Sequence, residues 1–548
     1  MTVLSIIKKY LGADMGKFVK FLIFNLLIYN LGIVFAIGRQ DVVGYTTYDW
    51  QFGGPVYTWC RTAAVCNGIH VCWLHSNFNP ADRNKGYNYY DFNTRQWHWP
   101  ANGILVYPQR SGFGNLDYDP ITGVAVVSAH QSATGGNRPV VAKDEAIGGG
   151  IFSYCQGPIG WQWPVISTSL NQAVHCVMID AASMDSLWYA RVQPWCTWST
   201  PINICPPAQS PMFICHNLAA SKISNKVIIL WQCSEDPYPQ RAFYRISNDG
   251  GINWQPTVQL PYPPVHGMTF TISSLFTMFD NQDNFHIVAS LSDTGVTVPA
   301  AIWHYCPVNN PQWNLIYHYA PETLAAPVGY NAIFATRPSI VQSPFTNYLY
   351  VSWEQFDSLN YEPTTGLARA DIWIAESPNN GLTWHNQQPI TIPNTTSKRY
   401  PCVGGVFADT LVVSYLIDSI AGGESFAQGR TTRNPVICHF IPLPYAGIEQ
   451  DIGYWKLEIG NLSASPNPFS SLTTINYSIP ANANATIEIY DISGRLVKSF
   501  SNNQQLKTKN PVIWNGKDNN GNQVKPGIYF CTLKTHDKTL TQKLVKTK

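Results

Sequence analysis

The sequence contains few charged residues. Only 12% of its 548 residues are Asp, Glu, Lys or Arg, whereas 45% are hydrophobic and 13% are aromatic. This composition excludes a disordered chain, because disordered segments combine high charge with few aromatic residues. No long hydrophobic run follows residue 36, so no membrane-spanning helix is predicted after the N-terminus. The aromatic residues, together with 39 Gly and 39 Pro, are typical of an all-β protein with short strands.

Common enzyme and metal-site motifs are also missing. No G-x-S-x-G, H-E-x-x-H or Walker-type loop occurs in the chain. The 13 cysteines show neither paired C-x-x-C nor Cys/His zinc spacing, so no metal site is predicted and no cofactor is expected. Residues 280–283, DNQD, lack the Gly and the distal Glu of a calcium loop and predict a hairpin turn.

The N-terminus predicts export. Lys17 and Lys20 flank the start of the apolar run FLIFNLLIYNLGIVFA, which ends at a small residue, Ala36, as a signal-peptidase site requires. We therefore predict a cleaved signal peptide over residues 1–36. A transmembrane anchor is the alternative, because the run is close to the length that spans a bilayer.

Charge is distributed unevenly along the chain. Residues 462–548 contain eleven basic and four acidic residues, whereas residues 37–461 contain 20 basic and 28 acidic residues. An acidic body does not attract a phosphate backbone, so nucleic acid is not an expected partner.

A short apolar segment rich in β-formers recurs along residues 40–448. Its copies begin roughly forty to sixty-five residues apart, with Gly-, Pro- and Asn-rich turns between them. A repeat of this length is typical of a β-propeller, in which each four-stranded blade buries its faces against its neighbours. Seven copies favour seven blades, and one short spacing leaves six open. The copies are HVCWLHS at 70, GVAVVSAH at 123, SLWYARV at 186, KVIILWQC at 226, FHIVASLS at 285, YLYVSWEQF at 348 and TLVVSYLI at 410.

Two turns share a Ser-x-Asp/Asn-x-Gly-x-x-Trp pattern. They consist of Ser247, Asp249, Gly251 and Trp254, and of Ser377, Asn379, Gly381 and Trp384. In such a turn the Asp or Asn side chain caps backbone N–H groups, Gly permits a positive φ, and Trp covers the edge of the sheet. The two turns resemble the Asp-box (BNR repeat) of sialidase-like β-propellers. The resemblance implies a structural turn between the outer strands of a blade, on the face away from the ligand.

The end of the chain, residues 465–548, follows a predicted linker over residues 449–464. It contains Asn467-Pro468-Phe469, the strand IEIYDISGRLV, the turn WNGKD at 514–518 and PGIYF at 526–530. These features resemble the type A C-terminal sorting domain of type IX secretion, an immunoglobulin-like β-sandwich. The resemblance implies passage through the periplasm, recognition by the secretion machinery of the outer membrane, and an extracellular or surface location. A simple Ig-like stalk is the alternative.

Four basic residues stand nine to eleven positions before apolar segments: Arg61, His216, Arg337 and Arg399. Equivalent positions in a radial repeat face one axis, so we predict that they converge at the mouth of the propeller. Converging arginines bind a carboxylate or another anion through bidentate hydrogen bonds. The alternative is a structural role for each of them.

Catalytic residues are harder to assign. Sialidases use three arginines, a Tyr nucleophile supported by Glu, and an Asp acid/base. The Arg-Ile-Pro motif of that family is missing here, and the nearest string, Arg245-Ile246-Ser247, belongs to an Asp-box. The candidates are Tyr350 and Glu354, which share strand parity, and Asp357. The alternative for Glu354 is an ion pair with an Arg of a neighbouring blade.

Three functions fit these observations. The first is a binding module that recognises an extracellular glycan or a surface protein. The second is a sialidase-like glycoside hydrolase that acts on an anionic sugar. The third is a structural surface-layer or adhesive component. Because propellers host many unrelated activities, the fold alone does not choose among them.

Overall fold

The computed structural model describes residues 38–51, 59–63, 67–78, 81–205, 213–234, 240–265, 267–293, 296–407, 409–424, 427–443, 462–477, 485–500, 512–535 and 539–547. The chain divides into two compact units, Met1–Tyr445 and Ala446–Lys548. All secondary-structure elements assigned in the described ranges are β-strands, which confirms the all-β prediction. None of these ranges holds a helix that is long and apolar enough to cross a membrane. The predicted signal peptide and most of the predicted linker lie outside the described residues.

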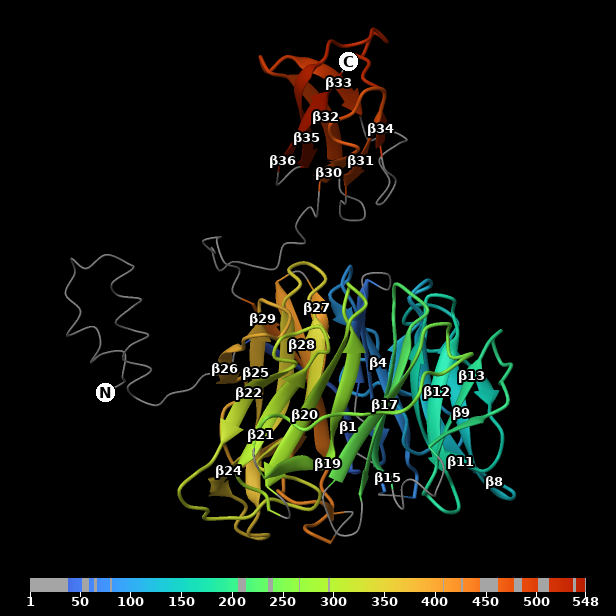
Figure 1. Cartoon of the computed structure of the whole chain (residues 1–548), viewed down its shortest axis with the longest axis vertical. Coiled ribbons are helices and arrows are strands. Elements are labelled where there is room, and N and C mark those ends of the chain that lie inside the picture. Colours follow the sequence, from blue (N-terminus) through green and yellow to red (C-terminus); the bar gives the residue numbers. More distant parts are fainter. Residues whose placement is uncertain are drawn as a thin grey trace, which may run out of the picture. The chain divides into compact units, whose positions relative to one another are not determined.

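The described part of the first unit forms seven antiparallel sheets (Figure 1). Their first strands are β2 (Trp59–Ala63), β7 (Leu116–Tyr118), β11 (Trp161–Thr168), β15 (Phe213–Ala220), β19 (Met268–Phe279), β23 (Ala335–Gln342) and β27 (Ser397–Phe407). Their second strands are β3 (Gly68–His75), β8 (Ala125–Ala133), β12 (Val174–Asp180), β16 (Val227–Ser234), β20 (Phe285–Asp293), β24 (Leu349–Tyr361) and β28 (Thr410–Asp418).

The third and fourth strands continue each sheet outward in the same up-and-down order. The third strands are β4 (Asn84–Asp91), β9 (Gly136–Asp144), β13 (Leu187–Val192), β17 (Gln240–Ser247), β21 (Ala300–Tyr305), β25 (Ala368–Ser377) and β29 (Asn434–Pro442). The fourth are β5 (Gln96–Trp97), β10 (Phe152–Gln156), β14 (Ile202–Cys205), β18 (Val258–Gln259), β22 (Trp313–Tyr319), β26 (His385–Pro389) and β1 (Arg39–Thr46). A short extra strand, β6 (Ile104–Leu105), also pairs with β4.

The sheets are arranged in a closed ring. Each first strand contacts the first strand of the next sheet, and β27 of the last sheet contacts β2. The last sheet takes its outermost strand, β1, from the start of the chain, where Arg39 pairs with Phe440 of β29. A ring of four-stranded antiparallel sheets closed in this way is a β-propeller, so the predicted fold is confirmed. The number of blades stays a prediction for the complete chain.

Six of the seven apolar segments found in the sequence are second strands. The exception is SLWYARV at 186, most of which forms the third strand β13, whereas VHCVMID forms the second strand β12. Both strands are apolar and buried, so composition does not distinguish them. With β12 in its place, the second strands β8, β12 and β16 begin about fifty residues apart, which accounts for the one irregular spacing.

Both Asp-box turns have the hydrogen bonds that their pattern predicts. Ser247 Oγ accepts the N–H of Gly251 at 2.8 Å, and Asp249 Oδ1 accepts the N–H of Asn253 at 2.8 Å. In the second turn Ser377 Oγ accepts the N–H of Gly381 at 2.9 Å. Asn379 Oδ1 accepts the N–H of Thr383 at the same distance.

The boxes join neighbouring sheets. Trp254 packs edge-on against Tyr189 of β13 at 4.9 Å between ring centroids, and Trp384 packs against His304 of β21 at 5.3 Å. Each of these partner rings is held by a histidine of its own second strand: Tyr189 Oη lies 2.6 Å from His175 Nδ1, and His304 Nε2 lies 2.9 Å from His286 Nδ1. These joints support the structural role of the boxes, and their His partners were not predicted.

Gly381 is the tightest point of the second joint. Its φ is +81°, and a Cβ there would lie 2.0 Å from the ring of His304. We expect Gly381→Ala to lower the free energy of unfolding by about 2–4 kcal/mol, from overpacking and the left-handed backbone together. Gly366→Ala is the matched control, because Gly366 has φ +71° with nothing within 4 Å, and should cost about 1–2 kcal/mol. Equal urea midpoints for the two variants would contradict this account of the joint.

The second unit consists of two antiparallel sheets around one core. One sheet contains β30 (Leu462–Ser465), β31 (Thr473–Tyr477) and β34 (Val512–Trp514). The other contains β33 (Leu496–Phe500), β32 (Ala485–Asp491), β35 (Gly527–Thr535) and β36 (Thr539–Lys546). Buried residues of both sheets, such as Ile475, Ile487 and Trp514, form a single cluster, as in a β-sandwich. The Ig-like assignment of its topology stays a prediction.

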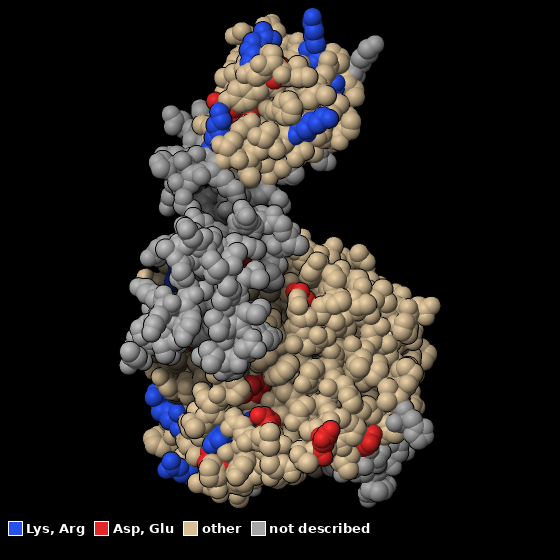
Figure 2. All heavy atoms as spheres, turned by 90° about the vertical axis from the view of Figure 1, so that its left-hand side faces the viewer, with Lys and Arg blue, Asp and Glu red and all other residues tan. Residues whose placement is uncertain are grey.

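The predicted motifs stabilise this sandwich. Asn467 accepts the N–H of Val545 at 2.8 Å and donates to the carbonyl of Lys543 at 2.7 Å, so the NPF segment binds the last strand β36. Trp514 donates its indole N–H to the carbonyl of Lys517 at 2.9 Å and thereby closes the WNGKD turn. Basic side chains are frequent on the face of this unit that Figure 2 shows, as the sequence predicts.

Candidate functional site

The four predicted ligand residues lie on first strands, which line the axis of the ring. Arg61 is on β2, His216 on β15, Arg337 on β23 and Arg399 on β27. The side chain of Arg61 lies outside the described residues. Arg337 and Arg399 come together. His216 lies elsewhere in the ring, and the described structure contains no hydrogen bond between it and either arginine.

Arg337 and Arg399 meet on one carboxylate. Nη1 of Arg337 lies 2.8 Å and Nε of Arg399 lies 3.3 Å from Oε2 of Glu354, which is fully buried. The second oxygen of Glu354 accepts the backbone N–H of Tyr400. Burial works against the charge of Arg399, but Glu354 holds the pKa of the guanidinium above its ordinary value. Glu354 thus forms the ion pair between neighbouring sheets that we gave as its alternative role.

Local backbone geometry places these groups. Arg337, Tyr400 and Trp163 have φ values of 53°, 58° and 53°, although none is a glycine. Each lies where its first strand shifts register against the second strand, as at a β-bulge. Non-glycine residues in this region cost about 1–3 kcal/mol each and are concentrated at functional sites. We call the end of the ring where the first strands begin, and where these bulges lie, the mouth.

The ring of Tyr400 lies close to both arginines at the mouth. The guanidinium carbons of Arg337 and Arg399 lie 5.0 and 4.9 Å from the centroid of its ring. Burial raises the pKa of Tyr400 to about 12, against the opposing effect of the two arginines. The predicted candidate Tyr350 packs instead in an apolar cluster with Ile372, and its cross-strand partner is Val341.

Two buried aspartates complete the cluster. Asp418 ends β28 and accepts the N–H of Ile420 at 3.1 Å and the side-chain amide of Asn434 at 3.2 Å. Burial, with the nearby charge of Asp49, raises the pKa of Asp418 to about 7. Asp49 is 6% exposed and accepts the backbone N–H of Glu424. We call Asp49, Arg337, Glu354, Arg399, Tyr400 and Asp418 the mouth cluster.

Aromatic rings lie at the rim beside Asp49. Trp50 is half-buried, and Tyr330 is 56% exposed with its ring 6.3 Å from that of Trp50. The backbone of Tyr330 donates to Oε1 of Gln428 at 3.0 Å, and the carbonyl of Asn331 accepts from Arg337 at 2.6 Å. The rim is therefore connected to the mouth cluster by hydrogen bonds.

The other predicted residues lie apart from the cluster. His216 is buried, its Nε2 lies 2.9 Å from the carbonyl of Trp163, and burial lowers its pKa to about 4. This bond holds the bulge of the neighbouring first strand. Asp357 is exposed on β24, where its side chain accepts the N–H of Leu359 at 2.9 Å. The catalytic and ligand roles of the predicted residues stay predictions.

Comparison with known proteins decides the role of the second unit. Residues 463–547 match the family described as "Secretion system C-terminal sorting domain". This segment is a type IX sorting domain. It marks the chain for export by the type IX machinery to the cell surface or the extracellular space, as predicted. No curated protein matches the chain.

Three solved structures that are similar to the chain are distant from it in sequence. A polysaccharide lyase, "PL25-Ulvanlyase", is 11% identical over 74% of this chain and 96% of its own, with a TM-score of 0.44. The α-L-arabinofuranosidase Arb93A from Fusarium graminearum is 12% identical over 62% and 97%, with a TM-score of 0.40. The Hadza microbial sialidase Hz136 is 12% identical over 70% and 74%, with a TM-score of 0.32. The propeller assignment depends on the closed ring of sheets, and the site has to be argued from its own residues.

Proposed function

We propose that the exported propeller binds an uncharged extracellular glycan at its mouth, without turnover. The observation that carries the proposal is the rim, where the exposed ring of Tyr330 and the half-buried ring of Trp50 lie beside carboxylates and amides. Aromatic rings present apolar faces that pack against the C–H face of a sugar ring, and carboxylates and amides hydrogen-bond its hydroxyl groups.

The charges of the mouth favour a neutral ligand over an anionic one. Of the three arginines predicted to bind an anion, the two whose side chains the structure describes, Arg337 and Arg399, already pair with Glu354. Asp49 and Glu424 add negative charge at the same end, and residues 37–461 are acidic as a whole. A site with this balance of charges repels anionic sugars rather than attracting them. The structure therefore argues against an arginine clamp of the sialidase type.

The rim residues can be tested by titration. We expect the exported protein to bind at least one of mannohexaose, xylohexaose and cellohexaose, and to bind a galacturonate hexamer more weakly. Tyr330→Ala should weaken the binding at least tenfold by calorimetry. When a ring of a ligand stacks on an aromatic side chain, the removal of that side chain costs about 1–3 kcal/mol of binding free energy. Tyr361→Ala is the control, since Tyr361 is a 46% exposed tyrosine that is not part of the rim. Equal loss in both variants, or tighter binding of the galacturonate, would refute the proposal.

A glycoside hydrolase is the second candidate, and Asp418 is the observation that favours it. A carboxyl with a pKa of about 7 beside a second carboxyl is the arrangement in which one group donates a proton and the other acts as base or nucleophile. If the protein hydrolyses the glycan that it binds, Asp418→Asn should lower the release of reducing ends about 10²–10⁴-fold. Binding with no release of reducing ends leaves the binding module as the function.

The two remaining candidate functions are binding to a surface protein and assembly into a surface layer. A surface-protein ligand would appear as binding to intact cells that survives removal of their glycans. A surface-layer component would self-associate, so its sedimentation would depend on concentration when all three hexasaccharides fail to bind. Either result would replace the glycan proposal.

A further inference from the structure

A cavity away from the mouth lies between the sheet of β7–β10 and the sheet of β11–β14. Its volume is about 220 Å³, and it is lined by Asp119, Lys143, Thr168, Gln172, Gln193 and Trp195, among others. Asp119 and Thr168 lie where the first strands β7 and β11 end. The mouth bulges lie near the starts of first strands, so this cavity opens at the opposite end of the ring. We call it the lower cavity.

The charged groups of the lower cavity neutralise each other. Nζ of Lys143 lies 2.9 Å from Oδ2 of Asp119, and Gln172 donates to the same oxygen at 2.9 Å. The side chain of Asp119 is 3% exposed, whereas that of Lys143 is 26% exposed. Lys143 therefore keeps N–H groups that face the cavity, but the pair has no net charge to attract an ion.

Trp195 supplies an aromatic wall. It is half-buried, and Nζ of Lys143 lies 5.9 Å from the centroid of its ring. Gln193, two residues earlier in the same loop, donates its amide to the carbonyl of Asn171 at 2.8 Å and so holds the loop against the neighbouring turn. Trp195 packs in part against the apolar cluster that contains Val126 and Val174.

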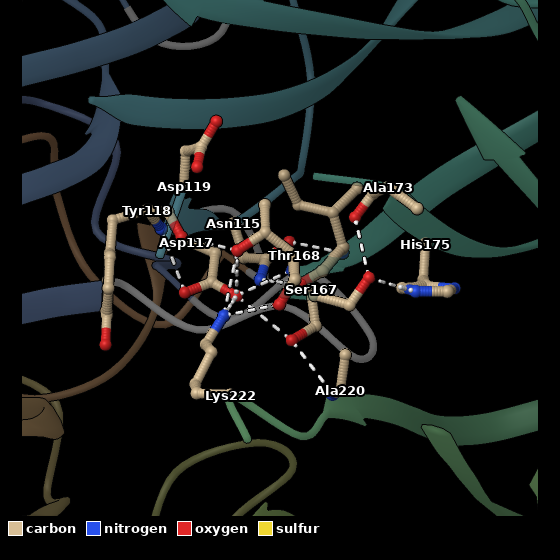
Figure 3. A network of polar contacts seen from close by, with 12 residues as sticks. Asn115, Asp117, Tyr118, Asp119, Ser167, Thr168, Ala173, His175, Ala220 and Lys222 are labelled. Atoms are coloured by element: carbon tan, nitrogen blue, oxygen red, sulfur yellow. Dashed lines mark hydrogen bonds and ion pairs between the residues drawn. The ribbon is translucent and has the colours of Figure 1, made fainter. Parts of the chain in front are cut away.

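Thr168, which lines the cavity, is held by a polar network that spans three sheets (Figure 3). Lys222, just after β15, donates from Nζ to Asp117 at 2.8 Å and to the hydroxyl and carbonyl of Thr168 at 2.8 and 2.6 Å. Asp117 also accepts the N–H of Thr168 at 2.9 Å and the hydroxyl of Ser167 at 3.0 Å. A lining residue held in this way does not have to be ordered when a ligand binds, which lowers the cost of binding.

We propose that the lower cavity is a second sugar site, which takes one neutral pyranose unit. An aromatic wall with amides and an internally neutralised ion pair matches an uncharged ring that carries hydroxyl groups. The volume is below the roughly 300–1,000 Å³ of pockets for drug-sized ligands, so it fits one sugar unit rather than an oligosaccharide. A bridging role rests on the proposed function of the mouth: with a glycan bound there, at the other end of the ring, one molecule would hold two glycan chains at sites that face different ways.

The test is a titration of the full exported chain with neutral monosaccharides and hexasaccharides, followed by saturation-transfer NMR. We expect Trp195→Ala to weaken monosaccharide binding at least tenfold, and Trp195→Phe, which keeps an aromatic ring, to bind within about threefold of the wild type. Tyr330→Ala separates the two sites, because it should leave the monosaccharide signal unchanged while it weakens the mouth.

The melting temperatures of both Trp195 variants check that the fold is retained. If no monosaccharide binds, or if Trp195→Ala binds as the wild type does, the lower cavity is not a sugar site, whatever the mouth does. If Tyr330→Ala removes all sugar binding, a single site at the mouth explains the data and the second site is refuted.

Discussion

Glu354→Gln is expected to lower the free energy of unfolding by about 3–5 kcal/mol, one of the largest effects of any single substitution in the propeller. Glu354 is fully buried and pairs with both Arg337 and Arg399, which are 1% and 4% exposed. Glutamine has the same shape but no charge, so two guanidinium groups in a low-dielectric interior would lose the counter-ion that they share. Urea and thermal unfolding of the full chain measure the loss.

Glu145→Gln is the control for that substitution, because Glu145 is exposed in the same propeller and its replacement should change stability by no more than about 0.5 kcal/mol. If Glu354→Gln unfolds at the same urea concentration as the wild type, the two arginines do not depend on Glu354. They would then be available to an anionic ligand, and the argument for a neutral glycan would lose its main support.

The second large effect concerns pH. Folding raises the pKa of Asp418 from 3.8 to about 7. Between pH 3.8 and about pH 7, the native state therefore holds a proton that the unfolded chain has released. The free energy of unfolding should therefore fall as the pH rises from about 4 to about 7. The slope is about 1.4 kcal/mol for each pH unit, which gives roughly 4 kcal/mol over this range. Asp418→Asn keeps the Oδ1 acceptor for Asn434 and Ile420 but has no proton to lose.

We therefore expect Asp418→Asn to be more stable than the wild type at pH 8, with the advantage shrinking as the pH falls toward 5. The difference in melting temperature between the two proteins, measured across this range, is the readout. A difference that stays constant from pH 5 to pH 8 would show that Asp418 titrates as it does in the unfolded chain, and the carboxyl could not then serve as the acid of a hydrolase.

The architecture could be predicted because its signals are local. Each second strand is a short apolar run, and each Asp-box encodes its own hydrogen bonds within a few residues, as Ser247 and Gly251 show. The sorting domain could be predicted for the same reason, since Asn467 and Trp514 act within short motifs. The order of β12 and β13 was ambiguous, because both strands are apolar and buried.

The mouth could be predicted only in part, because its residues are distant in sequence. Spacing placed Arg337 and Arg399 on first strands, but the bulge at Tyr400 that turns its ring between them has no signature in composition. Asp49 and Asp418 come near each other only because β1 pairs with β29 and so closes the ring in the sheet that contains β28. Strand parity suggested Tyr350, on the same strand, as the partner of Glu354. Parity gives no information on the neighbouring sheet, whose strand β27 supplies Tyr400 instead.

The most direct test of the account is hydrogen–deuterium exchange of the full exported chain, with and without the neutral hexasaccharide that binds most tightly. The account predicts slower exchange in three segments of the mouth, residues 47–51, 327–334 and 418–424, which contain Trp50, Tyr330 and Asp418. Unchanged exchange in all three segments at a saturating concentration of the sugar would contradict it, and the mouth of the propeller would not be its glycan-binding site.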